Sequence, residues 1–174
     1  KGQRLSSYNY MNKQERRILV VGDIHAPFEL KEYLQFCKDT YANYNCNQVI
    51  FIGDIVDNHA SSFHISDPDG MGGGDELDLA IERIKDWAIA FPVADVMIGN
   101  HDRIIMRKAF DGQIPARWIK DYNEVLGTIW SWLESVVYDN VLYEHGEGGQ
   151  ALTKAKNNMM SSVCGHTHTE AYVK

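Results

Sequence analysis

Cysteine is scarce in this 174-residue sequence, and long apolar runs are missing from it. The three cysteines, Cys37, Cys46 and Cys164, are an odd number in a chain whose first residues contain no apolar secretion signal. This predicts reduced thiols rather than a disulfide framework. No stretch approaches the roughly 18 uninterrupted apolar residues that a membrane helix needs. We therefore expect a soluble, cytoplasmic protein with no membrane partner.

Clusters of basic residues are lacking as well. The 17 lysines and arginines are scattered among 24 acidic residues, and the formal net charge is −7. That balance argues against an extended basic surface that binds nucleic acid electrostatically. It does not exclude a phosphate ligand, because two divalent cations in a cleft would add about +4 where the phosphate binds. Trp118, Trp130 and Trp132 lie among aliphatic residues, so we interpret them as core residues, with base stacking as the weaker alternative.

Length and composition fit one globular domain. The chain is 44% hydrophobic and falls within the size range of a domain with a single core. We assign residues 1–174 to one domain, with 1–16 as a peripheral N-terminal segment. The first residue is not methionine and Lys174 closely follows a motif, so we expect a trimmed start and further native residues beyond the end.

Three short apolar runs each end in glycine followed by a polar residue. They are RILVVGDIH from Arg17, QVIFIGDIVDN from Gln48 and VADVMIGNHD from Val93. Each is typical of a buried strand that breaks into a loop. Apolar residues at helical spacing follow the first two runs, at 29–41 and 75–90. Strands alternating with helices predict a largely parallel sheet whose ligands collect at the carboxyl ends of the strands.

The two predicted helices have definite apolar faces. These faces consist of Leu30, Tyr33, Leu34, Cys37 and Tyr41 in the first helix, and of Leu77, Ala80, Ile81, Ile84 and Ala88 in the second. We place Asp75 as the N-cap of the second helix, because its side chain can accept a hydrogen bond from the first turn. The glycine-rich stretch 66–76 predicts a flexible loop before it.

The rest of the chain predicts a different arrangement. Apolar spacing favours helices over 103–110 and 121–135, while 136–146 indicates two strands joined by a tight turn at Asp139-Asn140. A last short strand covers 161–164. We find no internal repeat and no second domain.

Polar side chains gather at the ends of the predicted strands: Asp23, His25, Asp54, Asn100, His101, His145, His166 and His168. Each alone has an ordinary explanation, because aspartate and asparagine form turns and a lone histidine is usually satisfied by a hydrogen bond. Together they bring carboxylate, imidazole and amide groups from five strands to one edge. Burying such groups without compensation costs several kcal/mol per charge, so bound cations are the simplest explanation.

The donor set favours a pair of metal ions. Seven candidate ligands exceed the needs of one four-coordinate zinc ion, and all are nitrogen or oxygen donors. We expect two divalent ions, Mn²⁺ first, with Fe, Zn²⁺ and Ni²⁺ as alternatives. Two metals about 3.5–4 Å apart need a bridging group and are suited to in-line displacement at phosphorus. Asp54, on the middle strand of the three, is the natural bridge.

Five segments resemble, in order, the motifs of the calcineurin-like metallophosphoesterases: GDIHAPF at 22–28, GDIVDN at 53–58, GNHD at 99–102, HG at 145–146 and GHTH at 165–168. The resemblance extends from about Arg17 to the end of the chain. It implies an α/β fold, a four-layer α/β/β/α sandwich of two mixed sheets flanked by helices, C-terminally truncated in this sequence. It also implies metal-dependent hydrolysis of a phosphomonoester or phosphodiester.

The same resemblance implies roles for individual residues. One metal ion would be held by Asp23, His25 and His168, the other by Asn100, His145 and His166, and both by Asp54. His101 would contact the phosphoryl oxygen and protonate the leaving group, with Asp57 orienting it. The nucleophile would be a hydroxide between the metals.

The sequence departs from the family's serine/threonine phosphatases, in which a phosphate-gripping arginine stands where this chain has Asn58. The third motif also ends in Asp102 rather than glutamate, and both differences argue against protein-phosphatase activity. Asn58, His59 and Arg103 are candidate substrate contacts, with a solvated helix start as the alternative for Arg103.

Three functions stay open at this point. The first is hydrolysis of a small phosphoester such as a nucleotide. The second is nuclease activity on DNA or RNA, which would call for a basic or aromatic rim. The third is a non-catalytic, metal-bound interaction scaffold, which the intact ligand positions and His101 disfavour. The sequence leaves the oligomeric state open.

Overall fold

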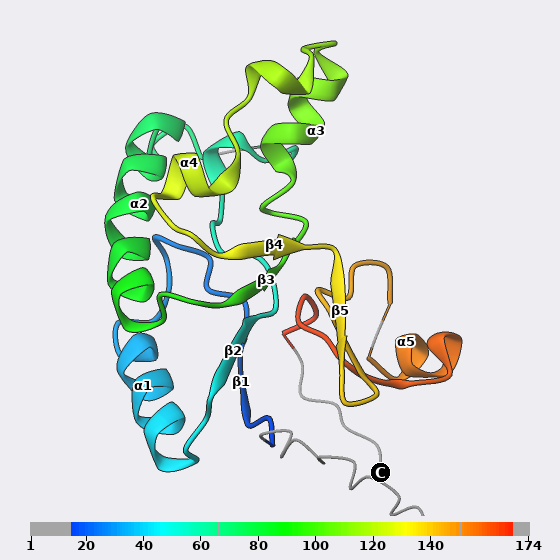
Figure 1. Cartoon of the computed structure of the whole chain (residues 1–174). Helices are drawn as coiled ribbons and strands as arrows, with labels where there is room; N and C mark the ends of the chain where they lie inside the picture. The colour runs from blue at the N-terminus through cyan, green and yellow to red at the C-terminus, as the bar shows by residue number, and fades with distance from the viewer. Residues whose placement is uncertain (1–14, 66, 150, 169–174) are drawn as a thin grey trace, which may run out of the picture.

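The computed structural model of the chain describes residues 15–65, 67–149 and 151–168. Two β-sheets lie at its centre (Figure 1). The first contains, in spatial order, β1 (Ile18–Val21), β2 (Gln48–Phe51), β3 (Asp95–Met97) and β4 (Ser131–Leu133), and all its neighbouring pairs are parallel. The second contains β5 (Ser135–Tyr138), β6 (Val141–Glu144) and β7 (Ser161–Val163). Its first pair is antiparallel and its second parallel.

Helices cover the outer faces of both sheets. They are α1 (Tyr33–Asn43), α2 (Gly73–Ala90), α3 (Ile104–Asp111), α4 (Tyr122–Leu126) and α5 (Ala151–Asn158), with short 3₁₀ turns η1 (His59–Ser61) and η2 (Ala116–Trp118). In Figure 1, α1, α2 and α4 lie beside the first sheet, α5 lies beyond the second, and α3 stands away from both. The predicted four-layer α/β/β/α sandwich is therefore confirmed, with the difference that only the second sheet is mixed.

The central strand β2 supplies both halves of the core. Successive side chains of a strand point to opposite faces. Phe51 packs in the cluster beneath the helices, against Trp87 and Trp130, whereas Ile50 packs between the two sheets, with Tyr143 of β6. Burial on both faces explains why this segment has a continuous apolar sequence instead of an alternating one.

Several predicted elements differ from those observed. The helix predicted over 121–135 is wrong, because α4 ends at Leu126, where Gly127 takes the left-handed conformation with φ 67°. The chain then extends into β4 beside β3. As predicted, Trp130 is a core residue and Trp132 packs against the core, but Trp118 is not in the core: its side chain is 77% exposed.

The prediction for α2 places its start too late. The helix begins at Gly73, so the last two glycines of the predicted loop are helical, and Asp75 lies in the first turn rather than at the N-cap, Gly72. Leu30 precedes α1 and is exposed, contrary to its assignment to the apolar face. Helix α5 was not predicted, because its sequence ALTKAKNN has too few apolar residues for a helical period.

The predicted hairpin is confirmed. Asp139 and Asn140 both have positive φ, 49° and 64°, as a two-residue hairpin turn between β5 and β6 requires. All three cysteines are free. Within the described ranges, no helix combines the length and the apolarity needed to cross a membrane. Most of the predicted peripheral segment 1–16 lies outside the described residues.

Candidate metal centre

The loops that follow the strands converge at one edge of the sandwich. Asp23 follows β1, Asp54 follows β2 and Asn100 follows β3, while His145 and His166 follow β6 and β7 of the second sheet. Parallel strands end at the same edge, which brings these groups together. Four of the predicted ligands have positive φ, namely His25, Asp54, His166 and His168. Left-handed backbone in residues other than glycine costs of order 1 kcal/mol each and persists where the surroundings enforce it, typically at functional sites.

One group of ligand atoms comprises Asp23, His25 and His168. Their donor atoms lie within 4.8 Å of one another, and Nε2 of His168 is 3.0 Å from Oδ2 of Asp23. Among the described residues, Oδ1 of Asp23 and Nε2 of His25 have no hydrogen-bond partner although both atoms are buried. Buried polar atoms are nearly always satisfied. A cation bound between them would satisfy both.

A second group comprises Asp54, His145 and His166. Nδ1 of His145 is 3.0 Å from the carbonyl oxygen of Ile52, which only accepts, so this nitrogen carries the proton. Nε2 then presents a lone pair toward Oδ1 of Asn100 at 2.9 Å and Oδ2 of Asp54 at 3.2 Å. Three lone-pair atoms facing one point are a suitable environment for a cation.

The Asp54 carboxylate lies between the two groups. Its Oδ2 atom is 3.2 Å from Nε2 of His145 in the second group and 3.8 Å from Nε2 of His25 in the first. Its Oδ1 atom accepts a 2.8 Å hydrogen bond from the backbone N–H of His101. One carboxylate thus contacts both groups and the loop that carries the predicted acid.

Asp57 differs from its predicted contact. Nδ1 of His101 lies 2.5 Å from the backbone carbonyl oxygen of Asp57 and 3.7 Å from its carboxylate. The carboxylate instead accepts from Nδ1 of His25 at 2.7 Å. The backbone of Asp57 therefore orients His101, while its side chain orients a predicted metal ligand, as partners outside the ligand sphere commonly do.

The three candidate substrate contacts have different surroundings. Asn58 donates its side-chain N–H to the backbone carbonyl of His101 at 3.0 Å. The imidazole of His59 is half exposed at the rim, 4.0 Å from the Asp57 carboxylate. Arg103 is the N-cap residue of α3, as the alternative predicted, and its partly exposed side chain forms ion pairs with Glu134 and Glu147.

Two buried carboxylates that sequence reasoning missed hold these loops in place. Asp102 accepts four backbone N–H bonds, from Asp54, Ile55, Val56 and Gly99, and so ties the loop after β2 to the loop after β3. Burial raises the pKa of Asp102 to about 6 despite these donors. Glu76 of α2 accepts the N–H groups of His59 and Ala60, both at 2.7 Å. The GNHD motif contains Asp102, but no local pattern identifies Glu76.

Space requires glycine at several motif positions, and at two of them the close neighbour is a carboxylate. A Cβ atom on Gly99 would clash with the Asp54 carboxylate, and one on Gly165 would clash with the Asp23 carboxylate. Each glycine therefore lets a predicted ligand pack directly against the backbone of the next loop.

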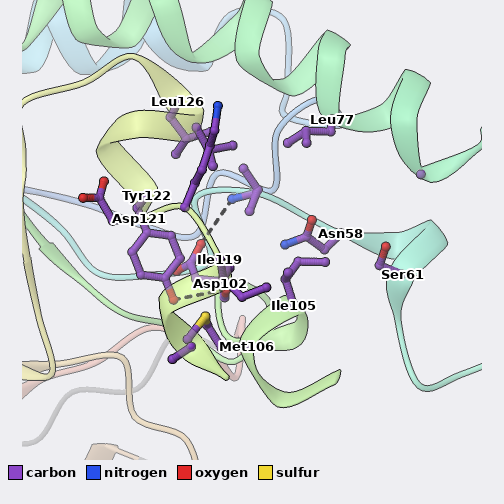
Figure 2. A pocket seen from close by; sticks show the side chains of 15 residues that line it. Asn58, Ser61, Leu77, Asp102, Ile105, Met106, Ile119, Asp121, Tyr122 and Leu126 are labelled. Atoms are coloured by element: carbon purple, nitrogen blue, oxygen red, sulfur yellow. Dashed lines mark hydrogen bonds between the residues drawn. The ribbon is translucent and has the colours of Figure 1, made fainter. Parts of the chain in front are cut away.

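A cavity of about 530 Å³ lies between the loops after β2 and β3 and the helices α2, α3 and α4 (Figure 2). Asn58 and Asp102 form part of its wall, and the hydroxyl of Tyr122 donates to the backbone carbonyl of Asp102 at 3.2 Å. Its described lining includes none of the predicted metal ligands. A smaller pocket of about 310 Å³ is lined by Asp23, Gly165 and His168, among others.

Comparison with known families agrees with this geometry. The profile of the calcineurin-like phosphoesterases matches residues 16–170. The chain belongs to the calcineurin-like phosphoesterase family. This membership indicates metal-dependent hydrolysis of phosphoesters, and it confirms the family resemblance. Searches of curated proteins and of solved structures find no match.

The electrostatics of this phosphoesterase favour a cation. Burial lowers the pKa of His25, but the hydrogen bond with Asp57 and the charges of Asp54, Asp57 and Asp23 outweigh it, so the pKa is raised. The pKa of His145 is raised in the same way by Asp54. Burial raises the pKa of Asp54, but His145 and His101 lower it overall. Positive charge is thus stabilised where the two groups meet.

Proposed function

We propose that this phosphoesterase hydrolyses a phosphomonoester or phosphodiester at two divalent metal ions, with Mn²⁺ favoured over Fe, Zn²⁺ and Ni²⁺. The observation that carries the proposal is the pair of buried, unpartnered atoms, Oδ1 of Asp23 and Nε2 of His25, beside the Asp54 carboxylate. Nitrogen and oxygen donors without thiolate fit such ions.

The residues of the two groups are the proposed ligands. Asp23, His25 and His168 hold one ion, Asn100, His145 and His166 hold the other, and Asp54 contacts both. The distances around Asp54 and His145 support this division. When bound, the ions supply Lewis-acid polarisation of the phosphoryl group and a lowered pKa for an attacking water.

His101 is the proposed acid. Its Nδ1 atom faces a carbonyl oxygen, which only accepts, so the proton on Nδ1 is retained and Nε2 is the atom that donates to the leaving group. Two further hydrogen bonds hold the residue: its N–H donates to Asp54 and its carbonyl accepts from Asn58. Asn58 acts here by positioning His101.

Substrate contacts follow from the same geometry. His59 is the best placed of the three candidates, because its imidazole is half exposed beside Asp57 at the rim. Arg103 is engaged by two glutamates and contacts substrate only if these pairs open.

Kinetics with a matched histidine control test the proposal. Wild-type protein with Mn²⁺ should hydrolyse bis-p-nitrophenyl phosphate or p-nitrophenyl phosphate. His101→Ala should reduce kcat about 10²- to 10⁴-fold, the usual contribution of a general acid. His64→Ala, which removes an exposed loop histidine, should not. Equal rates for wild type and His101→Ala would remove His101 from the mechanism. Absence of turnover by metal-loaded wild type would refute hydrolysis and favour the scaffold.

A further inference from the structure

The segment from 103 to 120 concentrates positive charge that looks scattered in the sequence. This α3 projection, as we name residues 103–120, contains five basic residues and one acidic residue. Its net charge is +4 in a chain whose total is −7. In Figure 1 its helix α3 stands beyond the sheets, and the chain then returns to α4. The basic residues of this segment are therefore less evenly scattered than the balance of the whole chain suggests.

The α3 projection also exposes aromatic rings. Phe110 is 80% exposed and Trp118 is 77% exposed, on the helix and on the 3₁₀ turn that follows. A groove of about 310 Å³ is lined by Arg103, Met106, Arg107, Phe110 and Asp111. Cationic and aromatic side chains therefore share one surface hollow.

Contacts hold the α3 projection beside the metal centre. Its first residue, Arg103, lies two positions after His101 and pairs with Glu147, two positions after His145. Phe63, in the loop after η1, packs under the Arg107 guanidinium at 4.8 Å and the Lys108 ammonium at 5.4 Å. The loop that follows His59 and η1 therefore contacts two of the basic residues of the α3 projection through Phe63.

We infer that the α3 projection binds single-stranded nucleic acid and makes a polynucleotide the substrate class of the adjacent centre, a refinement that rests on the proposed phosphoester hydrolysis. Single strands bind where cations follow the backbone and exposed aromatic rings stack on bases. The projection offers both features. The backbone of a polynucleotide is the phosphodiester that such a centre cleaves.

Charge argues against a symmetric dimer as the occupant. A symmetric dimer brings the same patch of both subunits together. That contact would place +4 against +4, whereas the remainder of the chain is acidic. A polyanion is the complementary partner.

Binding of a labelled oligonucleotide tests the inference. Fluorescence anisotropy would follow a 20-nucleotide phosphorothioate oligothymidylate, which resists cleavage, with Mn²⁺-loaded protein at several salt concentrations. Phe110→Ala with Trp118→Ala should weaken binding about 5- to 150-fold per stacked base lost. Arg107→Glu with Lys108→Glu should make the slope of log affinity against log salt less negative by about 1.4, the value for two phosphate contacts.

Matched controls lie on α1 and α2, outside the α3 projection. Phe36→Ala removes an exposed phenylalanine of α1, and Lys38→Glu with Lys85→Glu reverses two exposed lysines of α1 and α2. Neither should change the affinity. Circular dichroism should show unaltered folding for every variant, since all the replaced side chains are exposed.

The outcomes separate this inference from the proposed hydrolysis. Failure of wild type to bind the oligonucleotide, or equal losses in the controls, would overturn it. So would preferential binding to phosphatidylserine vesicles, or a dimer in sedimentation that Phe110→Ala with Trp118→Ala dissociates. Hydrolysis of bis-p-nitrophenyl phosphate by wild type is scored separately. If hydrolysis is absent while oligonucleotide binding is intact, the proposed chemistry of the metal centre is refuted and the inference about the α3 projection is retained.

Discussion

Replacing Asp57 with asparagine should weaken metal binding without displacing the proposed acid. The Asp57 carboxylate accepts from Nδ1 of His25 at 2.7 Å, while Nε2 of His25 is the buried atom free to bind a metal. Partners of this kind contribute about 10- to 100-fold to metal affinity, or roughly 1.4–2.7 kcal/mol. His101 should stay oriented, because its Nδ1 contact is the backbone carbonyl at 2.5 Å.

The pH at which this is measured affects the size of the effect. The hydrogen bond and charge of Asp57 help to raise the pKa of His25. The substitution therefore also weakens the binding of the proton that competes with the metal for His25. At pH 8 this competition is smallest and the full loss of affinity should appear. Calorimetric titration with Mn²⁺ at pH 8 would measure it, with Asp78→Asn on the exposed face of α2 as the control.

Steady-state kinetics at saturating Mn²⁺ would then test the assignment of Asp57. The kcat of Asp57→Asn should stay within a few-fold of wild type. If kcat instead falls about 100-fold or more while Mn²⁺ affinity is unchanged, the carboxylate acts through His101 and the reasoning from the backbone contact is wrong.

Three further predictions concern metal loading and stability. Asp54→Ala should lose both ions by elemental analysis, since Asp54 contacts both groups; two ions per chain would contradict its bridging role. The Tm of the metal-free protein should fall as pH rises above 6.5. The raised pKa values of His25 and His145 stabilise the fold fully below pH 6.5, and this stabilisation is lost above their pKa values in the folded state. The Tm of the Mn²⁺-loaded protein should instead rise with pH, and parallel curves would refute competition between metal and protons. Glu76→Ala should cost about 2–4 kcal/mol in urea unfolding, because two partly buried N–H groups lose a charged acceptor; exposed Glu82→Ala should cost little, and equal losses would argue against a structural role of Glu76.

Sequence reasoning was effective where local pattern and structure coincide. The strands followed by Gly-Asp or Gly-Asn are short and apolar, so the ends of β1, β2 and β3 were predictable. The polar side chains that follow each strand were predictable with them. The motifs also predicted which donors would meet, including His168, which lies 145 positions from Asp23.

What sequence reasoning missed depends on contacts between distant residues. The apolar residues of 121–135 suit a helix, but pairing of β4 with β3 outweighs that tendency after Gly127. Glu76 has an ordinary place in a helix pattern, and only the fold brings it to the backbone of His59. The positive charge of the α3 projection can be counted in the sequence, but only the fold shows that α3 stands beyond the sheets.

Each group of proposed ligands draws on both sheets. Asp23 and His25 come from the first sheet and His168 from the second, while Asp54 comes from the first and His145 and His166 from the second. The sheets are otherwise joined by an apolar layer around Ile50 and Tyr143. On the proposed ligand assignment, metal loading would be coupled to how tightly the sheets dock, and ions bound there would act as cross-links. Removing them should speed hydrogen exchange across β5, β6 and β7 more than across β1 and β2.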